Sequence, residues 1–300
     1  MKLGVHYSPQ MVQLLDEGTV EFDYFKVPFW PDLIAQAQAL RPAYIHFPLL
    51  VGSGIGDAIA GETGATSPVD WGAVEAALHQ TGTPFVNVHL APLIDHHPDI
   101  PNTSQDAGHI DRVTEALICD VRAVVRRFGA ERVIAENNPV NDTRILSAAM
   151  RPEVICRVIE ETGCGLLLDL SHARLSAPFF QMEVHDYLEA LPVAHIRELH
   201  ISGVQRLEGV WLERMQATLG AESPFLKRYQ NAPMDHLPMT DEDWGLVEAA
   251  FGHIASSRWA APETVGFEYS GVALWQAVTE IEILRADVPR LWSVVHPQTP

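Results

Sequence analysis

Eight short apolar segments recur along this chain of 300 residues, separated by stretches with the spacing of amphipathic helices. Short apolar runs bounded by glycine and turn residues are typical of buried strands. Strands that alternate with helices predict right-handed βαβ units, and eight such units predict an α/β fold, the (β/α)8 or TIM barrel. The predicted strands are residues 3–7, 22–27, 44–49, 85–90, 132–136, 165–169, 196–201 and 264–268; the predicted helices are 31–40, 69–80, 109–128, 152–161, 179–191, 241–255 and 272–285.

The length of the chain fits one barrel better than two domains. Single barrels of this kind commonly have ~250 residues. No linker or change in composition divides the chain, so we predict a single TIM-barrel domain over residues 1–300. Three long connections, residues 52–67, 91–107 and 202–239, follow predicted strands. They are therefore predicted to be βα loops at the carboxyl-end face, where barrel enzymes carry their active sites.

Most of the predicted strands end in a residue type that binds metal ions. Because the carboxyl ends of parallel barrel strands converge, these side chains are expected at one mouth. A site for divalent cations typically has His, Asp and Glu side chains and almost no Lys or Arg. This chain offers more such ligands than one ion can bind. The strand-end residues are His46, His89, Glu136, Asp169, His200 and Glu268.

Two histidines and one glutamate carry much of this pattern. A single strand-end His is more often a hydrogen-bonded structural residue, but His46 and His89 stand at equivalent places in successive predicted strands. Glu136 ends an apolar run, where an unpaired carboxylate is costly to bury. A metal ion or another cation has to offset that cost, and we predict that Glu136 bridges two ions.

Two short patterns add further candidates. In Asp169-Leu-Ser-His172 the carboxylate is expected on the strand end and the imidazole just behind it, so the pair can serve two neighbouring cations. An Asp at a strand end is also a common helix cap. Glu198 and His200 are two residues apart and share one face of a strand, so Glu198 is predicted to orient the imidazole.

Three more residues complete the set of candidates. Asp235 and His236 lie in the last long connection and are predicted to hold a third ion from a loop. Lys26 is a lone cation at the end of the second predicted strand. It can hold a substrate carboxylate or phosphate, or form a salt bridge with a neighbouring acid. Glu136, His172, Glu198 and Lys26 are the residues we predict to take part in catalysis.

The charge of the chain excludes some partners. The formal net charge is −19, and the Lys and Arg residues are scattered. Double-stranded nucleic acid and anionic membrane surfaces are therefore not expected as partners. The start of the sequence has no apolar run typical of a signal peptide, and no later segment has the ~18 apolar residues of a membrane span. These features predict a cytoplasmic protein.

Taken together, these motifs resemble the xylose-isomerase-like TIM barrels over essentially the whole chain. One branch that the chain resembles is that of apurinic endonuclease IV, which has a trinuclear metal site. The resemblance implies metal-ligand roles for His46, His89, Glu136, Asp169, His172, His200, Asp235, His236 and Glu268. Endonuclease IV has Asp-x-His where Asp235 and His236 are adjacent here.

A second branch, the multinuclear non-heme iron-dependent oxidative enzymes, shares more of the surrounding sequence. The similar stretches are Glu136-Asn137 followed by Pro139, residues 165–169, residues 198–203, and Asp235-His236 leading into Pro238 and residues 242–244. Members of this branch modify peptides, often at cysteine. The resemblance implies two or three divalent metal ions, with Fe favoured and Mn, Mg or Zn as alternatives. Asp-Leu-Ser-His departs from the Asp-x-Asn-Asn usual in this branch.

The leading interpretation is a multinuclear metal-dependent oxidative enzyme that acts on a peptide or small molecule, with a partner protein as a possible carrier of the peptide. The alternative is a sugar isomerase or epimerase that uses one or two Mn²⁺ or Mg²⁺ ions. A DNA-repair phosphodiesterase is disfavoured because the chain has no basic cluster. A metal-binding protein without catalytic activity remains as the fourth interpretation.

Overall fold

Eight parallel strands form the barrel that the sequence predicts. The computed structural model describes residues 1–62 and 65–297. Each barrel strand pairs in parallel with its neighbours, in the order β3-β2-β1-β13-β10-β9-β8-β7. The strands are β1 (Lys2–His6), β2 (Tyr24–Pro28), β3 (Ala43–His46), β7 (Val86–Leu90), β8 (Val133–Glu136), β9 (Gly165–Asp169), β10 (Ile196–Ile201) and β13 (Thr264–Phe267).

The third strand closes the barrel because it changes neighbours along its length. Its first half, β3, pairs with β2, whereas its continuation, β4 (Leu49–Val51), pairs in parallel with β7. The side chain of Asn87 holds the bend between the two halves: it accepts from the Phe47 N–H at 2.7 Å and donates to the Phe47 carbonyl at 3.0 Å.

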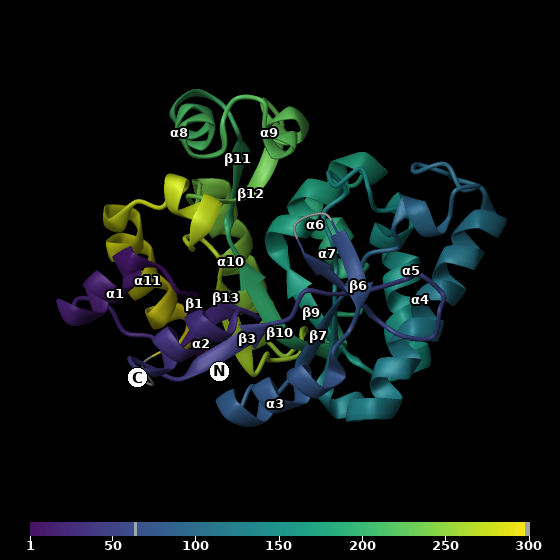
Figure 1. Cartoon of the computed structure of the whole chain (residues 1–300), viewed down its shortest axis with the longest axis horizontal. Coiled ribbons are helices and arrows are strands. Elements are labelled where there is room, and N and C mark those ends of the chain that lie inside the picture. The colour runs from purple at the N-terminus through teal and green to yellow at the C-terminus, as the bar shows by residue number, and fades with distance from the viewer. Residues whose placement is uncertain (63–64, 298–300) are drawn as a thin grey trace.

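Helices surround the strands, as Figure 1 shows. Several of their ends were visible in the sequence. Thr240 and Asp243 form a capping box at the start of one helix, and Gly82 and Gly163 end two others with φ of 69° and 72°. The outer helices are α1 (Pro9–Asp16), α2 (Pro31–Gln38), α3 (Trp71–Thr81), α4 (Ala107–Phe128), α5 (Pro152–Thr162), α6 (Leu170–Ser176), α7 (Val184–Glu189), α10 (Asp241–Ala255) and α11 (Ile281–Val295).

Two predicted helices have the wrong bounds. The chain forms α6 directly after β9, and a 3-10 turn at Ala177–Phe180 with Gln181 at φ 57° interrupts the helix predicted over residues 179–191. The helix predicted over residues 272–285 is a 3-10 segment, Ala273–Val278, followed by α11. The Tyr269 hydroxyl separates the two parts, since it donates to the Val278 carbonyl and accepts from the Glu280 N–H.

Two of the long βα connections contain structure of their own. The first carries a hairpin, β5 (Ile59–Glu62) and β6 (Ala65–Pro68), that extends the sheet beyond β4. The other, which we name the insertion, consists of β11 (Gly203–Arg206), α8 (Gly209–Leu219), α9 (Pro224–Tyr229) and β12 (Pro233–Leu237). It stands above the barrel at the top of Figure 1. A separate small core supports it, formed by Leu207, Met215, Leu226, Met234, Leu237 and Val278.

The barrel interior has an apolar layer below a polar one. Tyr24, Tyr44, Phe85, Ile134 and Leu167 form a buried cluster. Two residues further along the same strands are Lys26, His46, Asn87, Glu136 and Asp169, on the same face because side chains alternate along a strand. No helix in the described part of the chain is long and apolar enough to cross a membrane.

Candidate metal centre

The polar layer brings the predicted strand-end residues together at the carboxyl-end mouth. Their donor atoms form three overlapping groups, and within each group all the atoms lie within 4.8 Å of one another. Glu136 belongs to two of these groups, one with His46 and His89, the other with Asp169 and His172. The third group consists of His46, His200 and Glu268. Seven of the nine candidate ligands therefore form one connected cluster.

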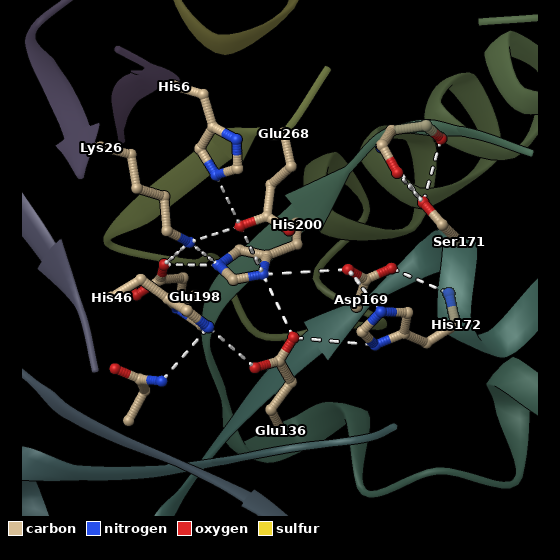
Figure 2. Close-up of polar contacts among 12 residues, drawn as sticks. His6, Lys26, His46, Glu136, Asp169, Ser171, His172, Glu198, His200 and Glu268 are labelled. Carbon is tan, nitrogen blue, oxygen red and sulfur yellow. Dashed lines mark hydrogen bonds and ion pairs between the residues drawn. The ribbon is translucent and has the colours of Figure 1, made fainter. Parts of the chain in front are cut away.

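His200 occupies the centre of this cluster. Its Nδ1 atom lies 3.4 Å from Glu136 Oε1, 3.3 Å from Glu268 Oε1 and 3.8 Å from Asp169 Oδ2. Figure 2 shows the three carboxylates around this imidazole. His200 Nδ1 is nevertheless a buried nitrogen with no hydrogen bond to any described residue.

An unsatisfied imidazole nitrogen among carboxylates fits a metal-binding role. Ligand atoms at ~2.0–2.2 Å from a shared ion lie roughly 3 Å or more apart, which is close to the separations around His200 Nδ1. His46 Nδ1 is likewise buried without a hydrogen bond among the described residues. Buried polar atoms are normally paired, so His, Asp and Glu donors in this arrangement fit divalent cations.

Glu198 and Lys26 lie on the other side of His200. Glu198 Oε1 accepts from His200 Nε2 at 2.7 Å, which is the contact expected from their spacing. Lys26 is 1 % exposed, and its Nζ lies 2.9 Å from Glu198 Oε1 and 3.0 Å from Glu268 Oε1. Of the two alternatives for Lys26, the structure shows the ion pair. Tyr44 donates its hydroxyl proton to the second oxygen of Glu198.

Asp169 is both a helix cap and a member of the cluster. One carboxylate oxygen accepts from the His172 N–H at 2.9 Å and begins α6, while the other lies 3.6 Å from His172 Nε2. The His172 ring also contacts the Asn137 carbonyl at 2.7 Å through Nδ1, and Asp235 at 2.9 Å through Nε2. The helix-cap interpretation of the Asp-x-x-His pattern is thus confirmed, and Asp169 and His172 also share a group of donor atoms with Glu136.

The prediction that Asp235 and His236 lie in a loop is wrong. Both are on β12, at the register shift between the Leu237 and Met234 pairings of this strand with β11. Their side chains reach the cluster from above: Asp235 contacts His172, and His236 Nδ1 lies 2.8 Å from the Glu268 carbonyl. His236 has φ 57°, a region that a residue with a side chain rarely adopts. Neither residue belongs to the three donor groups found among the described residues.

The charges of the cluster balance only in part. Burial by itself would raise the pKa of Glu136, but the imidazoles of His89 and His46 hold it well below its usual range. Burial would lower the pKa of His200, yet Glu268 raises it to about 10. Glu136 is therefore ionised near a protonated His200, whereas burial holds the pKa of His46 well below its usual range. Divalent cations compete with such protons for the same atoms.

Sequence reasoning missed several residues of the site. His6 Nε2 lies 3.3 Å from Glu268 Oε1 at the end of β1. Its signal was the same as that of His46, because it also ends an apolar run. Tyr44 precedes His46 by two residues and so shares its face. Asn137 had no local signal for its role, which is to hold Asp169 through two backbone hydrogen bonds of 2.8 and 3.0 Å.

The cluster forms the floor of a cavity of about 460 Å³. Among its polar lining residues are His46, His89, Glu136, His172 and Glu268. Much of the remaining lining is apolar and aromatic, from the segments that follow β2 and β13. Ligand sites commonly combine a cavity of this size with a few convergent polar groups. The arrangement can hold metal ions and a substrate in the same space.

The sequence is similar to known proteins. A family model described as "RiPP precursor modification enzyme MbnB/TglH/ChrH" matches residues 4–222. A UPF0276 protein of Psychromonas ingrahamii is 35 % identical over 104 residues, 34 % of this chain and 37 % of that protein. A UPF0276 protein of Caulobacter vibrioides is 27 % identical over 169 residues, 55 % of this chain and 56 % of that protein. These matches span about a third to about half of the relatives' own lengths.

Solved structures agree on the fold. The structure of a xylose isomerase domain containing protein of Salmonella typhimurium superimposes on this chain with a TM-score of 0.52 and 13 % identity. The match covers 98 % of this chain and 97 % of the other. The likeness confirms the barrel fold and says nothing about the reaction. The family match extends over most of the barrel and its ligand cluster, as the resemblance in sequence implied. The chain belongs to the MbnB/TglH/ChrH family of RiPP precursor modification enzymes.

Proposed function

We propose that this chain is a multinuclear metal-dependent oxidative enzyme that acts on a peptide and uses iron as its preferred metal. The description of its family supports a peptide precursor as the substrate class. The observation that carries the proposal is the shared position of Glu136, which joins two groups of donor atoms around an unsatisfied His200 Nδ1. One cation cannot use all these donors, so the cluster is suited to two or three ions.

The residues of the cluster have different roles in this proposal. His46, His89, Asp169, His172, His200 and Glu268 would hold the ions, with Glu136 between two of them. Iron at a mixed His and carboxylate site with open positions supplies the activation of dioxygen. Glu198, held by Lys26 and the Tyr44 hydroxyl, keeps the His200 ring turned so that Nδ1 faces the carboxylates.

His172 would hold an ion through Nε2. Its Nδ1 contacts the Asn137 carbonyl, and Nε2 lies between Asp169 and Asp235. Asp235 and His236 would hold the third ion from the insertion. A partner protein that delivers the peptide would have to dock around the open mouth, beside the insertion.

The experiment has two parts, and the first concerns the metal. Protein purified without oxygen is analysed for its elements and its visible spectrum is recorded. We expect at least two iron atoms per chain, with charge-transfer bands. Mn, Mg or Zn in place of iron, with no such bands, would favour the isomerase alternative.

The second part concerns the reaction. The iron-loaded protein is incubated with cysteine-containing peptides, including any encoded beside its gene, with and without dioxygen, and the products are weighed by mass spectrometry. We expect a change of peptide mass that needs both iron and dioxygen and is absent with Glu136→Gln. Interconversion of sugars without dioxygen, and no change in any peptide, would contradict the proposal.

A further inference from the structure

The cavity has two unlike sides. Three members of the metal-ligand cluster, His89, Glu136 and Asp169, are carried by β7, β8 and β9 on one side. The other side lies over β2, β1 and β13, which are neighbours in the sheet. In Figure 2, His6 and Lys26 stand on that side, opposite Asp169 and His172. Any substrate that reaches the cluster therefore has part of its surface against the second side.

Two aromatic walls form this second side. The first follows β2 and consists of Phe29 and Trp30. The second lies in the 3-10 segment after β13 and consists of Leu274 and Trp275. Because β1 lies between β2 and β13 in the sheet, the walls flank the end of β1. An apolar group between them would lie beside the cluster and still inside the same cavity.

Both walls are supported from behind. The Phe29 ring packs against Phe47, which is fully buried, with ring centroids 5.2 Å apart. The Trp275 ring lies 4.5 Å from His236 and 6.1 Å from Phe225 of α9. The backbone that carries Trp275 includes Ala273 at φ 54°. Residues with side chains persist in that region only where their surroundings hold them, so the second wall has a defined position.

Trp30 is the most exposed residue of the two walls. Its side chain is 44 % exposed, among the larger values for big apolar residues of the described chain. It precedes α2 without capping the helix through its side chain. The helix therefore does not require an indole at this position. A large exposed aromatic side chain at the rim of a ligand cavity is suited to contact with a ligand.

The chemistry of the walls selects the kind of group that fits. Phe29 and Leu274 offer no hydrogen bonds from their side chains, and each Trp offers one N–H. A sugar carries a hydroxyl on nearly every carbon, and each one needs a partner when it leaves water. An aromatic or long aliphatic side chain needs none and gains free energy from burial.

We propose that the walls form a subsite for a bulky apolar side chain, and that the peptide substrate carries such a residue next to the residue that reacts at the metal cluster. Trp30 determines this specificity. The inference rests on the proposed function, since it assigns part of the same substrate. It predicts that affinity depends on the neighbour of the reacting residue, and that Trp30 supplies much of that dependence.

The test uses two hexapeptides that differ only beside a single cysteine, where one has Phe and the other Gly. Their dissociation constants for the metal-loaded protein are measured by calorimetry without oxygen. We expect the Phe peptide to bind about tenfold more tightly, at the low end of what burial of such a side chain gives in a partly open site. Trp30→Ala should reduce the ratio to less than about threefold, and Trp30→Phe should keep most of it.

The control variant is Phe179→Ala. Phe179 is another exposed aromatic residue, 38 % exposed, and it does not line this cavity. The ratio of the two dissociation constants should not change in this variant. Equal binding of both peptides to the wild-type protein, or a ratio that survives Trp30→Ala, would overturn the inference.

A second pair of probes separates this inference from the proposed function. Phenyl and methyl glucoside are titrated into the same proteins. A preference for the phenyl compound that Trp30→Ala removes, with no binding of either peptide, would keep the apolar subsite and contradict a peptide substrate. Peptides that are modified but bind without preference would overturn the subsite alone. No binding of any of the four probes would overturn the inference as well.

Discussion

Glu136 illustrates what a single buried residue does in this molecule. It is 1 % exposed at the end of β8, and it shares donor groups with residues from β3, β7, β9 and α6. A carboxylate in that position is costly without compensating positive charge. The surrounding imidazoles supply part of it, and metal ions fitted between the donor groups would supply the rest.

Replacement of this one residue should therefore affect more than one ion. Glu136→Gln keeps the shape and removes the charge, and we expect the protein to lose more than one metal equivalent, as measured by elemental analysis. The control is Asp120→Asn, which alters a buried carboxylate that accepts from the backbone of residues 52–56 and belongs to no donor group. It should keep the wild-type number of ions. A full complement of metal in Glu136→Gln would show that Glu136 does not bridge.

The sequence predicted which strand-end residues come together, because each of them follows a short apolar run and the ends of parallel barrel strands converge. The same rule would have found His6, which follows an apolar run in the first strand, and Tyr44, which lies on the same face of its strand as His46. The role of Asn137 was not predictable, because its partner Asp169 is 32 residues away. The ion pairs of Lys26 with Glu198 and Glu268 also depend on how distant strands meet across the barrel.

Among the elements, the insertion differs most from expectation. A connection with few apolar runs gave no sign of β11 and β12, since a short hairpin is stabilised by what packs on it. Its small core has six buried residues, one of which, Val278, comes from the 3-10 segment after β13. Asp235 and His236 are thus carried by a unit with its own core.

The insertion should hold the weakest ion. If Asp235 and His236 bind a third ion, their support on a two-stranded hairpin is less rigid than that of strand-end ligands. Partial chelation should remove this ion first, and the double variant Asp235→Ala, His236→Ala should lack it. Glu222→Ala with Lys227→Ala, an exposed ion pair of the same insertion, should bind metal like the wild type. An unchanged metal content and affinity in the first double variant would exclude a third ion at these residues.

Helix α11 allows a prediction that does not involve the site. Burial raises the pKa of Asp287 to about 6, although Arg290 acts in the opposite direction. The unfolded carboxyl ionises near pH 4, so ionisation destabilises the folded protein progressively as pH rises from about 4 to about 6. The difference between the folded and unfolded pKa of Asp287 corresponds to at most roughly 3 kcal/mol of folding free energy. Partial exposure of the carboxyl reduces this cost to about 1 kcal/mol.

Asp287→Asn should therefore stabilise the protein at pH 7 by about 1 kcal/mol, and the gain should vanish below about pH 4. Denaturant unfolding of the wild type and the variant at both pH values measures the difference, and the low pH serves as the internal control. A variant that is less stable at pH 7, or equally stabilised at both pH values, would show that the carboxyl is not destabilised by burial.

For the whole molecule, closure of the barrel is what turns eight separate strand ends into one site. The alternation of apolar runs and helical stretches was enough to predict that closure, because βαβ units have one handedness and eight of them complete a barrel. The change of neighbours between β3 and β4 was not predictable, since it depends on Asn87 and Phe47 meeting across strands. The mouth carries the carboxylates of Glu136, Asp169, Glu198, Asp235 and Glu268, so cations bound there would offset part of the net charge of −19.

The central claim is that this mouth holds at least two iron ions joined by Glu136. Crystals of protein purified without oxygen, measured on both sides of the iron absorption edge, test it most directly. We predict at least two anomalous peaks, one beside His46 and His89, one beside Asp169 and His172, with a Glu136 oxygen at each and His200 Nδ1 beside one of them. A single peak that Glu136 does not contact, or no peak that depends on the iron edge, would contradict the account.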